Sequence, residues 1–364
     1  MQESARIPVR GLSHAIAALV AAGFWLTPAP AAQPDYREVR STPFLLPPEN
    51  VAVAVRAASG DFYFLARQSG AVYRYSGSGE FLNVFRVSSI TEISAGQFYL
   101  QPDLAVDRTG NVYCLGLFRP DGGQLQTVAL IFNPQGVYQK MVITTPRVEA
   151  RRIAVDADGS IYLVGVDPAY FRSTATPCLL LHKYTPDGRR IAAFSECPAG
   201  LRLRGAGASP GPDLPVLLTE CERGRVWIQT NSIFHALPRS HLVRQFDSAG
   251  KLVREAVLDR PKLAPSGPPV NPPGAGEDLA WRVMSTRSGR FLVEWQHADV
   301  AEGRRRNQRL LSIHDVGGGL VTQGVPPADG RAWLFSDDAG YCYAVRKKGA
   351  SRNAELLQID VGLN

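Results

Sequence analysis

The residue types that most often carry out chemistry are sparse in this chain of 364 residues, which has 6 His and 5 Cys. No two cysteines have the Cys-x-x-Cys spacing of a zinc or redox site. Neither the His-Glu-x-x-His zinc motif nor a phosphate-binding glycine loop occurs. His235 and His241 are six residues apart, a spacing that does not support a metal site. The sequence therefore identifies no catalytic residue and no metal ligand, and it implies no cofactor.

Aromatic and arginine side chains combine a large contact area with directed polar groups, so they suit recognition. Those in segments predicted to be loops are the candidate contacts Phe98, Tyr99, Phe118, Arg119, Tyr170, Phe171, Arg172, His235 and His241. The densest basic run, Glu302–Arg309, contains Arg304 and Arg305. This run fits an anionic partner, and the alternative is that it forms a solvated hairpin tip.

The elements that must position these side chains are repeated strand–turn–strand phrases. The clearest copies are Ala105–Tyr113 (AVDRTGNVY) and Ala154–Tyr162 (AVDADGSIY). In each copy an Asp lies three residues before the turn glycine, where its side chain can cap the turn backbone. We therefore assign Asp107 and Asp156 to structure rather than to catalysis. The phrase recurs around Gly60, Gly110, Gly159, Gly224, Gly289 and Gly340.

Each phrase belongs to a unit with a second hairpin, so the pattern has four strands per unit and six units. This predicts an all-β fold, a six-bladed β-propeller with four-stranded antiparallel blades. The fourth unit would begin with strands Pro215–Leu218 and Arg225–Ile228. The sixth unit ends after three strands, at Val361, and we expect the N-terminal segment Tyr36–Leu46 to supply the fourth strand and close the ring.

The two AVD phrases, together with the hairpin turns Phe132–Gly136 (FNPQG) and Tyr184–Gly188 (YTPDG), resemble the NHL-repeat family and its six-bladed propeller relatives. The resemblance implies the fold and is almost silent on function. Some relatives are lyases or lactonases that use His, or Glu, Asn and Asp, around a metal in the central channel. We find no such set at matching positions in this sequence.

In a propeller, successive connections emerge on opposite faces. Here the links between blades, and the connections between the second and third strands, hold nearly all the long segments, so we expect that face to bind a partner around the channel mouth. Near the starts of the innermost strands, the charged residues expected to project into the channel are Asp103, Arg151, Asp213 and Arg282. The alternative is that these charges pair with one another. The long segments are 87–102, 116–126, 167–177, 196–215, 230–240, 257–279 and 296–308.

The first 31 residues predict a cleaved signal peptide, because basic residues flank an apolar run, Gly11–Leu26, that small residues follow. A retained N-terminal anchor is the alternative. Export to the periplasm or the medium would leave residues 32–364 as the propeller and would permit disulfides. Cys178 and Cys197 flank a predicted hairpin at nearly opposite positions, so we expect them to form one.

The leading functional hypothesis is a secreted propeller that acts as a binding or scaffold module through its loop-rich face. The alternative is a metal-dependent hydrolase or lyase with its site in the channel, and a third possibility is a purely structural domain. The expected partner is a protein or an anionic glycan or lipid. A net charge of +7 that is mostly scattered does not indicate nucleic acid, and no later stretch of the sequence could span a bilayer.

Overall fold

The computed structural model describes residues 34–90, 93, 96–171, 177–198, 221, 224–229, 231–261, 277–301, 304–324, 327, 329, 331–337, 339–349 and 352–363. The predicted signal peptide, residues 1–31, lies outside these residues. So do Arg172, Asp213 and the predicted strand Pro215–Leu218.

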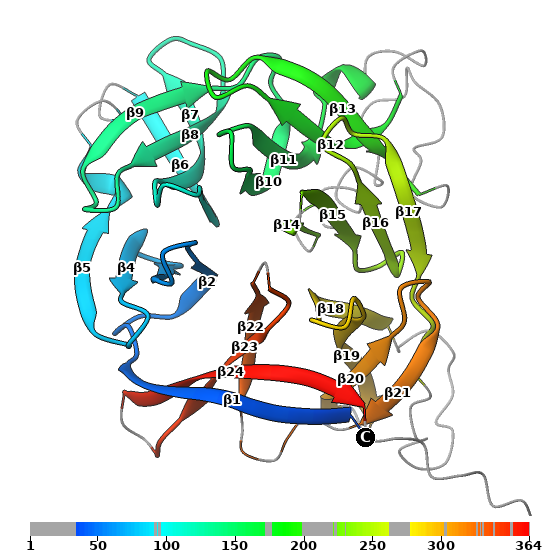
Figure 1. Ribbon diagram of the computed structural model, residues 1–364. Coiled ribbons are helices and arrows are strands. Elements are labelled where there is room, and N and C mark those ends of the chain that lie inside the picture. Colours follow the sequence, from blue (N-terminus) through cyan, green and yellow to red (C-terminus); the bar gives the residue numbers. More distant parts are fainter. Residues whose placement is uncertain are drawn as a thin grey trace, which may run out of the picture. The chain divides into compact units, whose positions relative to one another are not determined.

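The described residues form six antiparallel four-stranded sheets arranged in a ring, which is the predicted β-propeller (Figure 1). Blade 1 contains β2 (Val51–Arg56), β3 (Phe62–Ala66), β4 (Ala71–Tyr75) and β5 (Phe81–Arg86). Blade 2 contains β6 (Gly96–Val106), β7 (Val112–Pro120), β8 (Gln126–Phe132) and β9 (Tyr138–Ile143). Blade 3 contains β10 (Glu149–Val155), β11 (Ile161–Val166), β12 (Leu179–Tyr184) and β13 (Arg190–Glu196).

Blade 4 contains β14 (Arg225–Gln229), β15 (Ser232–Leu237), β16 (Leu242–Phe246) and β17 (Leu252–Val257). Blade 5 contains β18 (Glu277–Ser285), β19 (Phe291–Ala301), β20 (Arg304–His314) and β21 (Leu320–Gly324). Blade 6 contains β22 (Ala332–Ser336), β23 (Cys342–Lys347), β24 (Asn353–Leu363) and the N-terminal strand β1 (Pro34–Leu45). Two short 3₁₀ helices, η1 (Val87–Ser89) and η3 (Pro168–Phe171), lie in connections. Within the described ranges, no helix has the length and apolar character needed to cross a bilayer.

The ring closes as the sequence predicts. β1 pairs antiparallel with β24, from Pro34 opposite Leu363 to Leu45 opposite Asn353, and so becomes the outermost strand of blade 6. Figure 1 shows the two ends of the propeller unit side by side along this blade. The pairing covers the edge that the C-terminal strand would otherwise expose to other chains.

One turn geometry recurs around the propeller. Ten turns in the part of the chain that the structure describes share one five-residue hydrogen-bond pattern. The backbone N–H of the first residue donates to the carbonyl of the fifth residue, and the N–H of the fourth residue donates to the carbonyl of the first. The fourth residue is always glycine, since the backbone there has a positive φ, for example +83° at Gly159. Five of the six glycines used to find the repeats occupy this position, which explains why the pattern located most blades.

Blade 4 is the exception, and its predicted strand order is wrong. Arg225–Ile228 belongs to the innermost strand, β14, and not to the second strand, so Gly224 precedes the blade instead of turning it. β14 and β15 pair as far as Gln229 opposite Ser232, and Asn231 between them adopts φ +61°. Because Asn also tolerates this conformation, the turn needs no glycine and the sequence pattern misses it.

The hydrophobic core lies between neighbouring blades. Second strands are buried on both faces, as in β3 (FYFLA), so they are continuous apolar runs, whereas the outermost strand β5 is only partly covered. Apolar side chains of adjacent blades then pack together, and the first such cluster joins blades 1 and 2 through Tyr63, Leu65, Leu104 and Leu130. This packing fixes the innermost strands around the channel.

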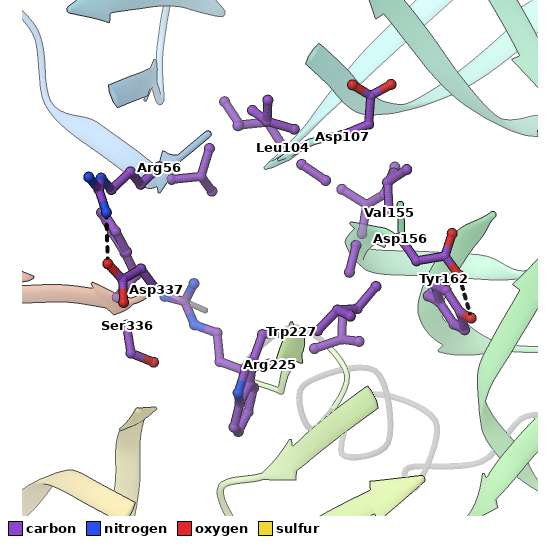
Figure 2. A pocket seen from close by; sticks show the side chains of 18 of the residues that line it. Arg56, Leu104, Asp107, Val155, Asp156, Tyr162, Arg225, Trp227, Ser336 and Asp337 are labelled. Carbon is purple, nitrogen blue, oxygen red and sulfur yellow. Dashed lines mark hydrogen bonds and ion pairs between the residues drawn. The ribbon is translucent and has the colours of Figure 1, made fainter. Parts of the chain in front are cut away.

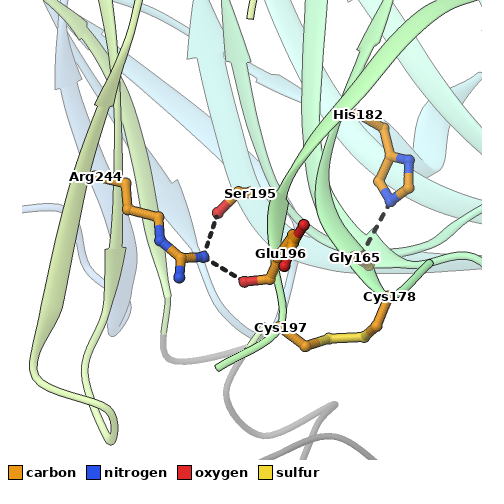
Figure 3. Close-up of a disulfide and its surroundings, with 7 residues drawn as sticks. All are labelled: Gly165, Cys178, His182, Ser195, Glu196, Cys197 and Arg244. Atoms are coloured by element: carbon orange, nitrogen blue, oxygen red, sulfur yellow. Dashed lines mark hydrogen bonds between the residues drawn. A yellow bond between two sulfur atoms is a disulfide. The ribbon is translucent and has the colours of Figure 1, made fainter. Parts of the chain in front are cut away.

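A disulfide joins Cys178 to Cys197 at the open end of the β12–β13 hairpin, in agreement with the predicted pairing (Figure 3). The two Cα atoms are 5.4 Å apart, and the Cys197 N–H donates to the Cys178 carbonyl at 2.8 Å. Arg244 of blade 4 donates to the Glu196 carbonyl beside it. The disulfide therefore fixes the edge of blade 3 where blade 4 packs.

Replacing both cysteines, Cys178→Ser with Cys197→Ser, is expected to lower the free energy of unfolding by about 3 kcal/mol, because the crosslink closes a loop with a sequence separation of 19 residues. Denaturant unfolding of both proteins measures the difference. A reducing agent should destabilise the wild type to the same extent and leave the variant unchanged. An unchanged wild type under reducing conditions would contradict the assignment.

Candidate functional site

A cavity of about 980 Å³ occupies the channel at the centre of the propeller (Figure 2). Residues of the innermost strand of every blade line it, together with several of the turns that follow these strands. Its size is at the upper end of the range for small-molecule sites. Its charged lining residues are five arginines and five aspartates: Arg56, Arg108, Arg152, Arg225, Arg282, Asp103, Asp107, Asp156, Asp158 and Asp337.

These charges are divided along the channel. Asp103, Arg152 and Arg282 lie four residues before the turns that end their strands, and Arg225 is the first residue of β14. All four therefore lie toward the end where the innermost strands begin. We call this set the arginine layer. It holds three guanidinium groups and one carboxylate, whereas the remaining lining charges, two arginines and four aspartates, belong to the opposite end.

Asp103 is the carboxylate of the arginine layer. It is 5% exposed, and its Oδ2 accepts a hydrogen bond from the backbone N–H of Ile153 at 2.8 Å, which ties blade 2 to blade 3. Burial raises the pKa of this carboxyl, and the nearby charges of Arg152 and Arg225 oppose that effect. The carboxylate thus partly balances two of the three arginines.

Two arginines of the layer have polar partners on the protein. The Arg152 Nε donates to the Gly224 carbonyl at 3.0 Å, across the boundary between blades 3 and 4. The Arg282 Nη1 donates to Glu294 Oε2 at 2.9 Å, and the buried Glu294 also pairs with Arg309. Burial lowers the pKa of Arg282 to about 10, with a further contribution from the Arg309 charge.

Arg225 differs from both. Figure 2 shows its side chain extending from β14 into the cavity. In the described part of the chain, no residue accepts a hydrogen bond from its guanidinium group. Burial lowers the pKa of Arg225 to about 9, and the charges of Arg152 and Arg282 lower it further. The group is still a cation at neutral pH, and its surroundings disfavour that charge.

At the opposite end of the channel, three of the charged side chains have hydrogen-bond partners on the protein. Arg56 donates to Asp337 at 2.8 Å and also lies over the rings of Phe62 and Tyr343. Asp156 accepts from Tyr162 at 2.9 Å, and Asp337 accepts from Tyr343 at the same distance. These contacts support the assignment of the turn aspartates to structure.

Asp156 offers a test of this assignment. Asp156→Ala is expected to cost about 2–3 kcal/mol, because it leaves the hydroxyl of the buried Tyr162 without its partner and removes one of the two acceptors of the Ser160 N–H, the other being Asp158 Oδ1. Asp247→Ala is the matched control. Asp247 caps the N–H groups of Ala249 and Lys251 at 3.0 and 2.9 Å, so its loss should cost about 1 kcal/mol. Equal losses by denaturant unfolding would refute the Asp–Tyr contribution.

Two paired extensions flank the channel on the face where the innermost strands begin, which we call the loop-rich face. In blade 2, Gly96–Leu100 pairs with Gly116–Pro120, and in blade 5 the β19–β20 hairpin continues to Ala301 opposite Arg304. Blades 2 and 5 lie on opposite sides of the ring (Figure 1). The mouth therefore has an extension of paired strands on each of two facing sides.

Several segments predicted to be loops are strands in the structure. Residues 116–126 and 296–308 contribute to these extensions, and residues 230–240 contain β15. His235 is consequently a fully buried strand residue that contacts Ser195 Oγ at 2.7 Å, and His241 is 6% exposed and packs against Trp295. Residues 116–126 (GLFRPDGGQLQ) and 296–308 (QHADVAEGRRRNQ) are rich in glycine and in polar or charged residues, a composition typical of loops, which explains the error.

The other predicted site residues occupy varied positions. Tyr99 is 51% exposed on β6, and Tyr170 in η3 is half-buried against the core. Asp103 and Arg282 line the cavity, but Arg151 donates to Gln101 and is not a lining residue. A β-bulge between Ala150 and Arg152 shifts the register, so that Arg152 faces the channel in its place. The backbones of Arg304 and Arg305 pair with those of Ala301 and Val300.

Sequence reasoning missed Arg152 and Arg225. Arg152 is next to Arg151, which was predicted, but the sequence gives no signal for the β-bulge that turns Arg152 toward the channel. Arg225 was predicted to lie in the second strand of blade 4 and lies in the innermost strand instead. In the ranges that the structure covers, no group of three or more His, Cys, Asp or Glu side chains is arranged to hold a metal ion.

The sequence matches no protein-family model and no curated protein. Solved structures are similar in fold. A member of the DUF4221 family from Bacteroides vulgatus is 8% identical, with a TM-score of 0.55 over 92% of this chain and 100% of that one. A protein from Bacteroides fragilis described as a candidate exported protein is 10% identical, with a TM-score of 0.52 over 91% and 96% of the two chains. At these identities the comparison establishes the β-propeller fold alone.

Proposed function

We propose that this protein is an exported, NHL-repeat-type propeller that serves as a binding or scaffold module and holds a partner at its loop-rich face. The observation that carries the proposal is the channel mouth, where paired extensions of blades 2 and 5 flank an arginine-rich layer. Loops and extensions held on a rigid sheet scaffold are suited to recognition. The partner is a protein or an anionic glycan or lipid, since the basic run of the β19–β20 hairpin belongs to this face.

Charge reversal on the two faces tests the proposal. In one variant, Arg304→Glu and Arg305→Glu change the β19–β20 hairpin. In the matched control, Arg189→Glu and Lys251→Glu change exposed residues of turns on the opposite face. Labelled proteins are applied to an array of anionic glycans and to vesicles that contain phosphatidylglycerol. We expect the first variant to lose at least tenfold in binding and the control to match the wild type. Equal losses in both variants would contradict a role for the loop-rich face.

Export is the second part of the proposal. Residues 1–31 are expected to be removed on secretion, so the mature chain would begin at Ala32. Mass determination of the protein recovered from its native compartment tests this. An intact N-terminus that stays with the membrane fraction would favour a retained anchor.

A further inference from the structure

We propose that the arginine layer is an oxyanion-binding site, which takes a phosphate, sulfate or carboxylate group of a ligand that enters the channel from the loop-rich face. The inference rests on the proposed binding function and names the chemistry that the channel mouth would recognise. The site is formed by Arg152, Arg225 and Arg282 from three consecutive blades, with Asp103 on the fourth side.

The charge count supports an anion. Three guanidinium groups against one carboxylate leave two positive charges in the layer. Behind it, Glu294 and Arg309 cancel each other, so they do not reduce this excess. The opposite end of the channel has an excess of two negative charges, from four aspartates and two arginines. The channel is therefore polarised, and a negative group is attracted toward the end where the innermost strands begin.

Arg225 gives the site an unused binding group. Its guanidinium extends into the cavity with no hydrogen-bond acceptor among the described residues, while Arg152 and Arg282 repel it. In the empty protein this half-buried guanidinium therefore faces two like charges with no acceptor among the described residues. An oxyanion would accept its N–H groups, in one or two charge-assisted hydrogen bonds, and would neutralise the repulsion.

The cavity also has the right dimensions and composition for such a ligand. Its volume of about 980 Å³ exceeds what one oxyanion group requires, so the remainder of the ligand can extend along the channel. Apolar residues such as Leu104, Ile153 and Val283 lie next to the charged ones on the innermost strands. This arrangement fits a small molecule, or the end of a glycan, that has one anionic group and a less polar remainder.

The test uses the mature protein and simple probes. Sodium phosphate, sodium sulfate and sodium acetate are titrated against sodium chloride of equal ionic strength, and binding is followed by calorimetry and by the melting temperature. At a tenfold excess over the dissociation constant, at least one oxyanion is expected to raise the melting temperature of the wild type by about 2–4 °C. The three salts show whether the site prefers a tetrahedral anion or a carboxylate.

Four variants decide whether the response comes from the arginine layer. Arg225→Gln should lose at least tenfold in affinity, and Arg225→Lys should bind at an intermediate level because it keeps the charge without the planar fork. Arg254→Gln removes an exposed arginine from the outermost strand of the same blade and should match the wild type. Asp103→Asn can still accept from Ile153, so this variant should fold and bind the anion severalfold more tightly.

The empty proteins give a further readout. Without an oxyanion, Arg225→Gln should melt at or above the wild-type temperature, which a merely structural arginine would not do.

The inference is overturned if no oxyanion raises the melting temperature of the wild type beyond the effect of chloride, or if Arg225→Gln responds to oxyanions as the wild type does. If oxyanions fail to bind while charge reversal at Arg304 and Arg305 still abolishes partner binding, only this inference falls. If oxyanions bind through Arg225 and partner binding ignores that charge reversal, only the proposed function falls.

Discussion

A chain that begins at Leu46, and so lacks β1, is expected to lose most of its stability. β1 pairs with β24 along its whole length and buries Phe44, whose ring packs against Phe64 and Tyr75 of blade 1 at 5.6 and 5.8 Å. Losing that burial and the hydrogen bonds of the pairing should cost at least about 5 kcal/mol. A loss of this size is comparable with the total stability of a typical domain.

The matched control begins at Gln33 and keeps β1. It should unfold cooperatively at the wild-type temperature, whereas the shorter chain should be aggregated or largely unfolded, because β24 becomes an open edge. Circular dichroism and size-exclusion chromatography distinguish these outcomes. A shorter chain that stays monomeric and melts with the control would show that the ring does not need the N-terminal strand.

Acid should destabilise the protein from about pH 6.5 downward, before carboxylates of ordinary pKa begin to titrate. His182 and His235 are buried, and burial lowers their pKa to about 4 and about 3. In the described part of the chain, His182 Nδ1 and His235 Nε2 have no hydrogen-bond partner, so protonation would leave a buried N–H unpaired. Both rings are neutral in the folded protein at pH values where the unfolded chain binds protons.

The sign of the effect follows from this difference. In the unfolded chain both histidines have an ordinary pKa near 6.5, so the unfolded state takes up more protons than the folded state as the pH falls from about 6.5 to 4. The stability that the two neutral rings contribute is therefore present above pH 6.5 and is lost as the pH falls below it. The two groups together should remove about 5 kcal/mol between pH 7.5 and 4.5. Asp156 opposes them, because burial raises its pKa to about 6 and the folded state then binds that proton more tightly.

Denaturant unfolding across this pH range measures the dependence. His182→Asn with His235→Asn should lose stability much less steeply, because neither side chain titrates. His314→Asn alone is a weaker test, since its Nδ1 already contacts the Gly318 carbonyl at 2.9 Å. A double variant as sensitive to acid as the wild type would assign the effect to other groups.

The sequence predicted the blades because their turns have a strict chemical requirement. A five-residue turn with a positive φ at its fourth residue needs glycine at that position, and Gly60, Gly110, Gly159, Gly289 and Gly340 all meet it. Blade 4 failed because Asn231 makes its turn in another way. The closing strand could be predicted as well, since an open sixth blade would leave an unpaired edge.

The channel was harder to predict than the fold. Which residues of a strand face the channel depends on the β-bulges that several innermost strands contain, and a one-residue shift exchanged Arg151 for Arg152. The excess of arginine at one end is a property of several blades together. It becomes visible only when residues far apart in sequence, such as Asp103 and Arg225, are placed around one axis.

The central claim is that the loop-rich face is the binding face. Photo-crosslinking from single positions in the native compartment tests it most directly, with a photoreactive residue at position 99 on the blade 2 extension and, as the control, at position 189 on the opposite face. We expect a discrete adduct from position 99 and none from position 189. Adducts from position 189 alone, or equally from both positions, would contradict the account.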